Sequence, residues 1–261
     1  MEHQMAKQND PLVTVIMPAY RAGAYVEAAI RSVMAQTMPN WELIVIDDCS
    51  GDETPEIVRA LTREDSRVRL VCNEKNMGVA RTRNRGMDMA RGQFVALLDS
   101  DDVWMPEKLE RQLALMEKTG ADICYCSYAI VDARGERCRP DYLVPPETDF
   151  RSLLGENVIG CSTVVLSRRV LEEHRFITDF YHEDYVLWVT LLREGFRAAG
   201  CQEPLVHWRL IENSRSFNKR KAAGNRWRIF RDYLHLPLGQ SLLAFAAYGK
   251  SSMRKYFRKL R

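Results

Sequence analysis

The chain has 261 residues, of which 46% are hydrophobic and 28% are charged, and its formal net charge is +3. This composition is ordinary for a globular protein and excludes a collagen-like, coiled-coil or largely disordered chain. The length suits one large α/β domain with an appended segment.

Seven cysteines are scattered along the chain with no Cys-x-x-Cys pair and no Cys/His spacing of a zinc site. We expect reduced and mostly buried thiols. Residues 1–11 are polar and mixed in charge, and no run approaches the roughly 20 apolar residues that span a bilayer. We therefore expect neither a secretory signal nor a membrane span, and a cytoplasmic location.

Positive charge is concentrated at one end of the sequence. Residues 205–261 contain 14 lysines and arginines against two acidic residues, a net charge of +12, which leaves −9 for residues 1–204. A moderately acidic body thus precedes a strongly basic C-terminal segment.

The first half of the chain alternates apolar runs with amphipathic segments, which predicts β-α-β units around a mostly parallel sheet. The predicted strands are residues 13–17, 41–46, 68–71, 94–98 and 122–130. Helices are predicted near residues 26–34, from Thr54-Pro55, over 79–91 before Gly92, and over 106–118.

Beyond residue 131 the pattern is weaker. Residues 134–146 are rich in charge and proline and are predicted to be a loop. A strand is predicted within 160–166 and a helix over 183–193, and the composition turns basic near Glu203.

Polar groups follow three of the predicted strands: Pro18-Ala-Tyr20, Asp47-Asp48 and Asp99-Ser-Asp-Asp102. Ligands of open parallel sheets bind beyond the carboxyl ends of the strands, so these groups predict a site there. A solvated turn explains one acidic pair, but explains two acidic strand ends less well.

Asp99 and Asp101 are separated by one residue, so both carboxylates can face one divalent cation. Mg²⁺ and Mn²⁺ prefer oxygen ligands and commonly complete their shell with phosphates of the substrate. The alternative, an acidic cap for the helix that follows, suits Asp102 better.

The ordered segments VIMPAYRAGAYVEAAIRSVMAQT, WELIVIDDCSGDET and NMGVARTRNRGMDMARGQFVALLDSDDVWMPEKL resemble the family 2 glycosyltransferases. The similarity is close over residues 12–130 and looser over 164–195. It implies the GT-A fold, a Rossmann-like α/β architecture with a central, mostly parallel sheet flanked by helices. We accordingly predict a catalytic domain over 1–204, with a nucleotide-sugar half at about 12–102 and an acceptor half at about 103–204, followed by a basic helical extension over 205–261.

The resemblance implies a role for each matching residue. Asp48 should hydrogen-bond the base, commonly uracil, Asp101 should be the principal ligand of Mn²⁺ or Mg²⁺, and Asp99 should meet the ribose or the metal. Arg81 or Arg83 should lie near the acidic motif, and Arg83 matches the family pattern better. The nucleotide-sugar site is thus predicted to comprise Pro18, Ala19, Tyr20, Asp48, Arg81, Arg83, Asp99, Ser100 and Arg209.

The catalytic base is expected in the pair Glu183-Asp184. Asp184 matches the inverting base, and Glu183 would orient it or bind an acceptor hydroxyl; taken alone, the pair also suits an ordinary helix start. Trp188 suits either a sugar platform or the core. Arg209, with Ser214 and Ser216, resembles a segment that caps the donor phosphates when a loop closes.

The donor expected from this resemblance is a nucleotide-diphosphate sugar, with a UDP-sugar favoured, and the acceptor is a glycan or lipid-linked sugar of cell-surface polysaccharide or glycolipid assembly. The QxxRW signature of processive relatives is absent, which favours transfer of a single sugar. Two alternatives remain open: a non-catalytic or bifunctional interaction protein of the same fold, and a sugar nucleotidyltransferase.

The basic segment 250–261 also carries an apolar stripe at helical spacing: Met253, Tyr256, Phe257 and Leu260. Such a helix is predicted to lie along an anionic membrane, which would place the protein peripherally on the inner face of the cell membrane. A plain solvated helix and a binding surface for another partner, such as a protein, are the alternatives. No nucleic-acid recognition motif accompanies the charge, so no nucleic acid is expected as a partner.

Overall fold

The computed structural model describes residues 11–211 and 219–257, and the side chains of residues 219–220 and 254–257 are not described. Its centre is a ten-stranded sheet in the order β3-β2-β1-β4-β9-β6-β10-β5, with β7 paired to β6 and β8 paired to β10. The strands are β1 (Val13–Ala19), β2 (Trp41–Asp47), β3 (Val68–Cys72), β4 (Phe94–Leu97), β5 (Val103–Trp104), β6 (Ile123–Val131), β7 (Arg137–Tyr142), β8 (Glu147–Thr148), β9 (Val165–Ser167) and β10 (Ala198–Arg209).

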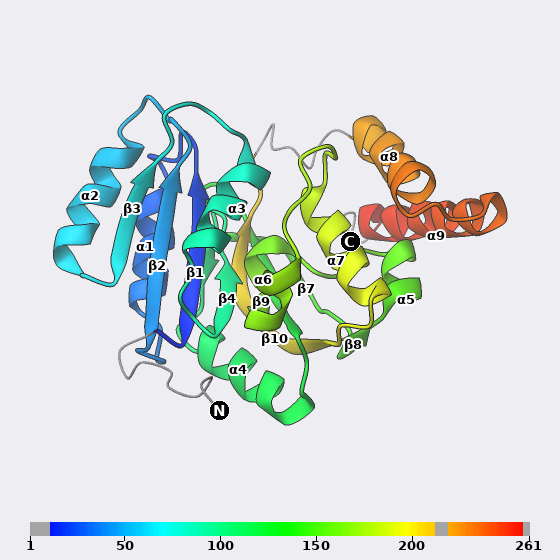
Figure 1. Cartoon of the computed structure of the whole chain (residues 1–261), viewed down its shortest axis with the longest axis horizontal. Helices are drawn as coiled ribbons and strands as arrows, with labels where there is room; N and C mark the ends of the chain where they lie inside the picture. The colour runs from blue at the N-terminus through cyan, green and yellow to red at the C-terminus, as the bar shows by residue number, and fades with distance from the viewer. Residues whose placement is uncertain (1–10, 212–218, 258–261) are drawn as a thin grey trace.

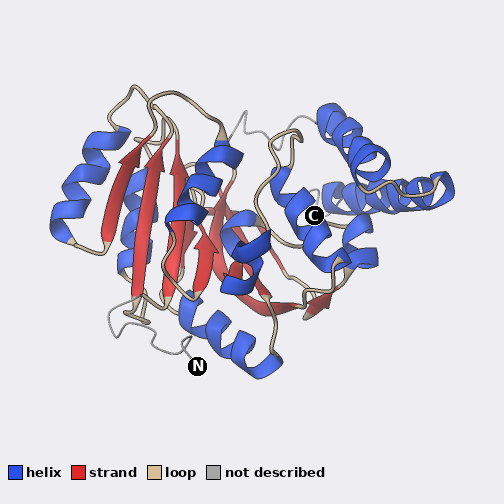
Figure 2. Ribbon diagram, in the orientation of Figure 1, coloured by secondary structure: helices blue, strands red, loops and turns tan. Residues whose placement is uncertain are grey.

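Helices cover both faces of this sheet (Figure 2). One face carries α1 (Val26–Met34), α2 (Thr54–Glu64) and α4 (Lys108–Thr119). The other carries α3 (Val79–Met89), α5 (Phe150–Gly155), α6 (Arg168–Glu173), α7 (Glu183–Arg193) and α9 (Leu238–Phe257), together with the short π-helix η3 (Ile229–Tyr233). The helix α8 (Lys219–Arg228) precedes η3, and the turn η1 (Cys161–Thr163) precedes β9.

The two-residue period of the strands divides the core between these faces. Val15 and Met17 belong to the core cluster that contains the buried residues of α1. Ile16, which lies between them in sequence, belongs to the opposite cluster with those of α3 and α7. Every residue of β1 and β2 is buried, as expected for parallel strands covered on both faces.

The strands β3, β2, β1 and β4 are parallel, so the predicted β-α-β order holds in this half. The other half is mixed. The strand β9 runs antiparallel to both β4 and β6, while β10 is parallel to β6 and antiparallel to β5 and β8. Antiparallel pairs need no helical crossover, so this half does not show the regular strand-helix alternation in its sequence.

Two segments differ from their sequence-based predictions. The loop predicted over 134–146 contains β7, whose charged, partly exposed residues and Pro140 are typical of an edge strand. The strand predicted within 160–166 is reduced to β9, because the turn η1 occupies residues 161–163.

The boundary predicted between residues 204 and 205 falls inside β10. Ile229 and Phe230 are fully buried in the same core cluster as Tyr185 of α7, and α9 packs on α5. Figure 1 shows α8 and α9 at one end of the molecule, next to α7 and α5. None of the helices in the described part of the chain has the length and apolarity needed to cross a membrane.

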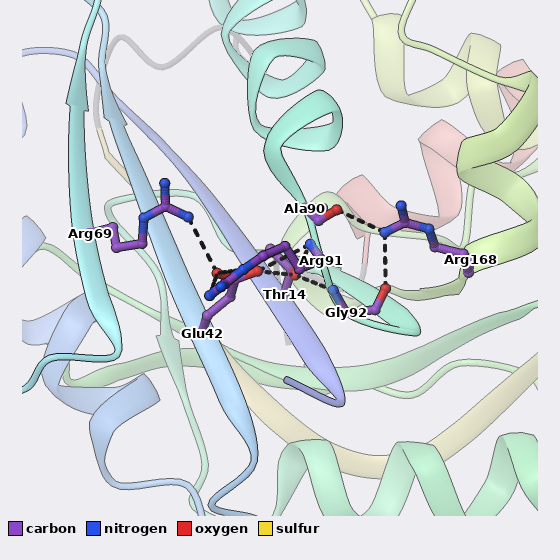
Figure 3. Close-up of polar contacts among 7 residues, drawn as sticks. All are labelled: Thr14, Glu42, Arg69, Ala90, Arg91, Gly92 and Arg168. Atoms are coloured by element: carbon purple, nitrogen blue, oxygen red, sulfur yellow. Dashed lines mark hydrogen bonds and ion pairs between the residues drawn. The ribbon is translucent and has the colours of Figure 1, made fainter. Parts of the chain in front are cut away.

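The amino ends of the first strands are tied together by Glu42 of β2 (Figure 3). Its buried carboxylate accepts hydrogen bonds from Thr14 of β1 at 2.8 Å and from Arg91 at 2.7 Å, and Arg69 of β3 lies 3.5 Å away. Burial raises the pKa of Glu42, but the hydrogen bonds from Arg91 and Thr14 outweigh it and lower that pKa. This cluster lies at the end of β2 opposite to Asp47, so we assign it a structural role.

Candidate active site

The residues predicted to line the nucleotide pocket lie at or just beyond the carboxyl ends of β1 and β2. Pro18 and Ala19 are buried within β1, whereas Tyr20 is 47% exposed just beyond it. The next residue, Arg21, has a φ of +50°, and Cys49, which follows Asp48, has a φ of +62°. These left-handed conformations are uncommon for residues other than glycine. They turn the backbone sharply after the end of each of the two strands.

Asp48 organises the loop that enters α3. Its buried carboxylate accepts hydrogen bonds from Asn73 Nδ2 at 2.7 Å, from the Met77 amide at 2.8 Å and from the Gly78 amide at 2.8 Å. Gly78 has a φ of +82°, a conformation that favours glycine. Both oxygens of Asp48 therefore have donors within the chain, and its contact with a nucleotide base remains a prediction.

Close packing of α3 on the sheet places an arginine in the interior. A Cβ atom on Gly86 would lie 2.5 Å from Ile16 and 2.9 Å from Ile46, so only glycine permits this approach. Arg83, one turn earlier on the same face, is buried, whereas Arg81 is exposed. Of the two arginines considered from the sequence, Arg83 is the one beside the acidic loop.

Arg83 joins the two acidic motifs. Its Nη2 donates to Asp99 Oδ1 at 2.5 Å, and its Nη1 donates to Glu183 Oε1 at 2.8 Å. Asp99 follows β4 and Glu183 begins α7, so one guanidinium links the loop after β4 to the start of α7. Ionised pairs of this geometry are among the strongest hydrogen bonds in proteins.

Asp102 does not cap the following helix, contrary to the alternative considered from the sequence, because α4 is preceded by Glu107. Instead its buried carboxylate accepts from Ser162 Oγ at 2.5 Å and from the Arg209 amide at 2.8 Å. Burial, followed by repulsion from Asp101 and Asp99, raises the pKa of Asp102 well above its usual range. This residue thus anchors the acidic loop to η1 and β10.

Arg209 holds the same loop from the other side. Its Nε donates to the Asp101 carbonyl at 2.8 Å, and its Nη1 donates to the carbonyls of Asp132 and Ala133 at 3.2 and 3.0 Å. The guanidinium is therefore engaged within the chain, and its predicted contact with donor phosphates remains a prediction. Ser214 and Ser216 lie outside the described residues.

Asp99 and Asp101 are suited to holding a hard divalent cation. Burial, followed by the charge of Asp99, raises the pKa of Asp101 to about 6, a cost that a bound cation would relieve. Ser100 lies between them and is half-buried. No group of three His, Cys, Asp or Glu side chains in metal-binding geometry occurs among residues 11–211 and 219–257. A cation here would thus take two protein carboxylates and complete its shell with phosphate and water.

Asp184 follows Glu183 in the first turn of α7 and is half-buried. Burial, followed by the charge of Glu183, raises its pKa to about 6. A carboxylate with such a pKa is ionised at neutral pH and is a better proton acceptor than an exposed one. Trp188, one turn further on, is fully buried in the core and cannot serve as a sugar platform.

A pocket of about 280 Å³ brings the two acidic motifs together, because Asp99 and Asp184 both line it. Its other walls are the 157–163 segment, Tyr128 and Trp208, the residues His182 and Tyr185 on either side of Glu183-Asp184, and Arg226 of α8. Sequence reasoning missed the 157–163 segment, which lacks a recognisable motif, and Arg226, which is one of many basic residues near the C-terminus.

Comparison with known proteins identifies the family. A family model described as glycosyl transferase family 2 matches residues 14–176. WfgD of Escherichia coli, named as a UDP-Glc:α-D-GlcNAc-diphosphoundecaprenol β-1,3-glucosyltransferase, is 38% identical over 234 residues, which are 89% of this chain and 90% of WfgD. The Bacillus subtilis glycosyltransferase TuaG, named for teichuronic acid biosynthesis, is 35% identical over 245 residues, which are 94% of this chain and 97% of TuaG.

Two solved structures are similar in fold. TarS of S. aureus, solved with UDP-GlcNAc, aligns with a TM-score of 0.72 at 21% identity, over 90% of this chain and 71% of that one. The mannosyltransferase PcManGT of Pyrobaculum calidifontis, solved with GDP-Man and Mn²⁺, aligns with a TM-score of 0.69 at 18% identity, over 95% of this chain and 76% of that one. The predicted GT-A fold is thereby confirmed.

Proposed function

The chain belongs to glycosyl transferase family 2, and from that premise we propose that it transfers a single sugar from a UDP-sugar to a hydroxyl of a lipid-linked acceptor, with inversion, in cell-surface polysaccharide assembly. The observation that carries this proposal is the bridge from Asp99 through Arg83 to Glu183. It sets the acidic loop beside Asp184, with both acidic motifs on one pocket.

In this reaction Asp184 accepts the proton of the acceptor hydroxyl as its oxygen attacks the anomeric carbon from the face opposite the departing diphosphate. A positioned base of this kind typically contributes about 10²–10⁴-fold to the rate. Arg83 holds Glu183 and so fixes the first turn of α7, in which Asp184 lies. The rings of Tyr128 and Trp208 offer apolar surfaces in the pocket for the faces of a sugar.

Asp101 and Asp99 would hold Mn²⁺ or Mg²⁺, which would supply positive charge opposite the diphosphate as the sugar leaves. Mn²⁺ accompanies GDP-Man in the PcManGT structure, in agreement with this assignment. WfgD is named for a UDP-Glc donor and a diphosphoundecaprenol acceptor, and TarS binds UDP-GlcNAc. These names support a uridine nucleotide and an acceptor that carries a lipid diphosphate.

A screen of nucleotide sugars by thermal shift, with and without Mn²⁺, tests the donor assignment. One UDP-sugar should raise the melting temperature only with the metal, and incubation with lipid-linked acceptors should then give a product whose new anomeric bond has the opposite configuration to the donor. A retained configuration would contradict the inverting mechanism. Stabilisation by no nucleotide sugar would contradict the proposed function.

We further propose that the outer face of α9 rests on an anionic membrane. Leu238, Leu242, Leu243 and Met253 are exposed on this helix, with Leu243 at 75%, while Ser241 and Ala244 face the protein. Lys250 is exposed on α9, and Lys221 is exposed on α8. Apolar side chains flanked by basic ones match the boundary between acyl chains and anionic headgroups.

Flotation of the full chain with liposomes that contain anionic lipid tests this surface. The double variant Leu242→Glu/Leu243→Glu should reduce flotation, whereas Leu143→Glu, which alters a side chain that is 64% exposed elsewhere, should not. Equal flotation of all three proteins, or no flotation of the unaltered chain at low salt, would contradict a membrane contact through α9.

A further inference from the structure

The basic C-terminal part of the chain contributes one side chain to the pocket. Arg226 of α8 is only 5% exposed, unlike Lys221 and Arg228 on the same helix, which are exposed. It lines the pocket together with Asp99 and Asp184. A charged residue is almost never buried to this degree unless it is paired, so its partners decide its role.

Aromatic rings fix the position of this guanidinium. Its Cζ atom lies 3.3 Å from the centroid of the Tyr185 ring and 4.9 Å from that of Tyr248 on α9. Tyr185 directly follows the proposed base, Asp184. Arg226 is therefore held next to the reacting residues by α7 and α9.

The adjacent residue strengthens this placement. Asn225 of α8 is buried, and its Oδ1 accepts a hydrogen bond of 3.0 Å from the amide of Tyr181. Tyr181 and His182 lead directly into α7. The helix α8 is thus fastened to the segment that presents Glu183 and Asp184.

Two nitrogen atoms of Arg226 are unused in the described structure. Nε and Nη1 are buried and have no hydrogen-bond partner among the described residues, and no ion pair joins Arg226 to a described acidic residue. A buried cation without a counter-ion costs several kcal/mol. An anionic group of a bound substrate would supply the counter-ion and offset this cost.

We infer that Arg226 binds a phosphate group of the acceptor, on the sugar whose hydroxyl gives its proton to Asp184. The inference rests on the proposed function. A guanidinium with two free donors matches two phosphate oxygens, and this planar fork binds phosphate better than a lysine does. The phosphate of the donor is the other source of the same chemistry, but the donor diphosphate is assigned to the metal site at Asp99 and Asp101.

Calorimetric titration of the full chain separates the two sources. N-acetylglucosamine 1-phosphate, a phosphorylated probe, and N-acetylglucosamine, its neutral counterpart, are titrated into protein saturated with UDP and Mn²⁺, so that the donor site is filled. UDP is titrated separately. The variants are Arg226→Gln, which removes the charge, Arg226→Lys, which keeps the charge and loses the fork, and the control Arg228→Gln on the exposed side of α8.

Arg226→Gln should weaken binding of the phosphorylated probe by about 10- to 100-fold, as expected for one or two charge-assisted hydrogen bonds, and leave UDP binding within about twofold. Arg226→Lys should give an intermediate loss, and Arg228→Gln none. Melting temperatures report whether each variant folds. Because binding is measured without turnover, a chain that transfers no sugar would count against the proposed function and not against this site.

Three results would overturn the inference. One is a loss of UDP affinity in Arg226→Gln without a loss for the phosphorylated probe, which would place the anion on the donor. The second is an equal loss for the phosphorylated and the neutral probes. The third is an unaltered chain that binds the two probes equally.

Discussion

The Nη1 atom of Arg83 donates to Glu183 Oε1 at 2.8 Å across 100 positions of sequence, and both side chains are buried. The same guanidinium also reaches Asp99. One arginine on α3 therefore sets the relative position of the two acidic motifs.

The first prediction concerns this bridge. Arg83→Ala should lower the free energy of unfolding by about 3–5 kcal/mol, because it removes the arginine that forms a buried ion pair with Glu183. Arg83→Lys retains the positive charge but cannot contact both Asp99 and Glu183. This variant should therefore fold, but its rate of sugar transfer should be lower than that of the unaltered protein. Chemical denaturation and kinetics measure the two effects. Arg81→Ala is the matched control on the same helix, and an equal loss in that variant would remove the special role of Arg83.

The second prediction separates the base from its neighbour. Asp184→Asn should reduce transfer by about 10²–10⁴-fold, because the amide cannot accept the proton, while donor binding stays within about twofold. Glu183→Gln should cost less in transfer but should also lower the melting temperature, because its contact with Arg83 is weakened. Steady-state kinetics and UDP titration check this, with Asp179→Asn in the preceding exposed segment as the control. Wild-type turnover in Asp184→Asn would show that the base lies elsewhere.

The third prediction is the pH dependence. The pKa of Asp184 is raised to about 6 by burial and by Glu183, so the residue is protonated below that pH and cannot act as a base. The kcat/KM for transfer should therefore rise with pH through about 6 and level off above it. Asp101 has a raised pKa of about 6 as well, so donor binding with the metal should weaken in the same acid range. Measuring donor binding alongside the transfer rate separates the effects of Asp184 and Asp101. In Asp184→Asn, donor binding should still depend on pH, whereas the pH dependence that Asp184 gives to the transfer rate should be lost.

The fourth prediction concerns the metal. Asp101→Asn or added EDTA should abolish the thermal stabilisation by UDP and Mn²⁺, which in the unaltered protein should reach several degrees when UDP is about 100-fold above its Kd. Asp179→Asn should leave it intact. Full stabilisation of Asp101→Asn by UDP and Mn²⁺ would argue that Asp101 is not a ligand.

The fifth prediction concerns Glu42. Its pKa is lowered in the folded protein by Arg91 and Thr14 despite burial, so its contribution to stability is present above the pKa of the unfolded chain, near 4, and is lost as the pH falls through the folded value. Glu42→Gln should cost about 1–3 kcal/mol at neutral pH, and the difference from the unaltered protein should shrink in acid. Urea denaturation at several pH values measures this. Glu27→Gln, on an exposed pair with Arg31, should cost less than about 0.5 kcal/mol.

The parallel half of the sheet was largely predictable, because β1, β2 and β4 are largely buried apolar runs, β3 is a partly buried one, and an amphipathic helix separates each strand from the next. The mixed half was less predictable. Residues 137–142 resemble a loop in sequence because β7 is a charged edge strand. The strand β10 was missed because its exposed and buried residues follow neither the alternation of a strand nor the spacing of a helix. Long-range pairing, which the local sequence does not encode, creates both strands.

The acidic residues of the site were predictable from their positions in the sequence. Asp47-Asp48 and Asp99-Ser-Asp-Asp102 follow predicted strands, and Glu183-Asp184 matches a family pattern. Arg226 was not, because nothing in the sequence distinguishes it from the basic residues around it. Only the packing of α8 against Tyr185 buries this one and leaves Arg228 exposed. The function of a charged residue in such a segment depends on contacts that form after folding.

The antiparallel strand β9 has a mechanical consequence. It is hydrogen-bonded to β4 on one side and to β6 on the other, so the sheet continues without a break from the parallel strands to the mixed ones. Hinge bending between the two halves would have to break these ladders. Exclusion of water during the proposed reaction would then come from rearrangement of loops around a rigid frame, and the spacing between the proposed base and the proposed metal ligands would be set by that frame before either substrate binds.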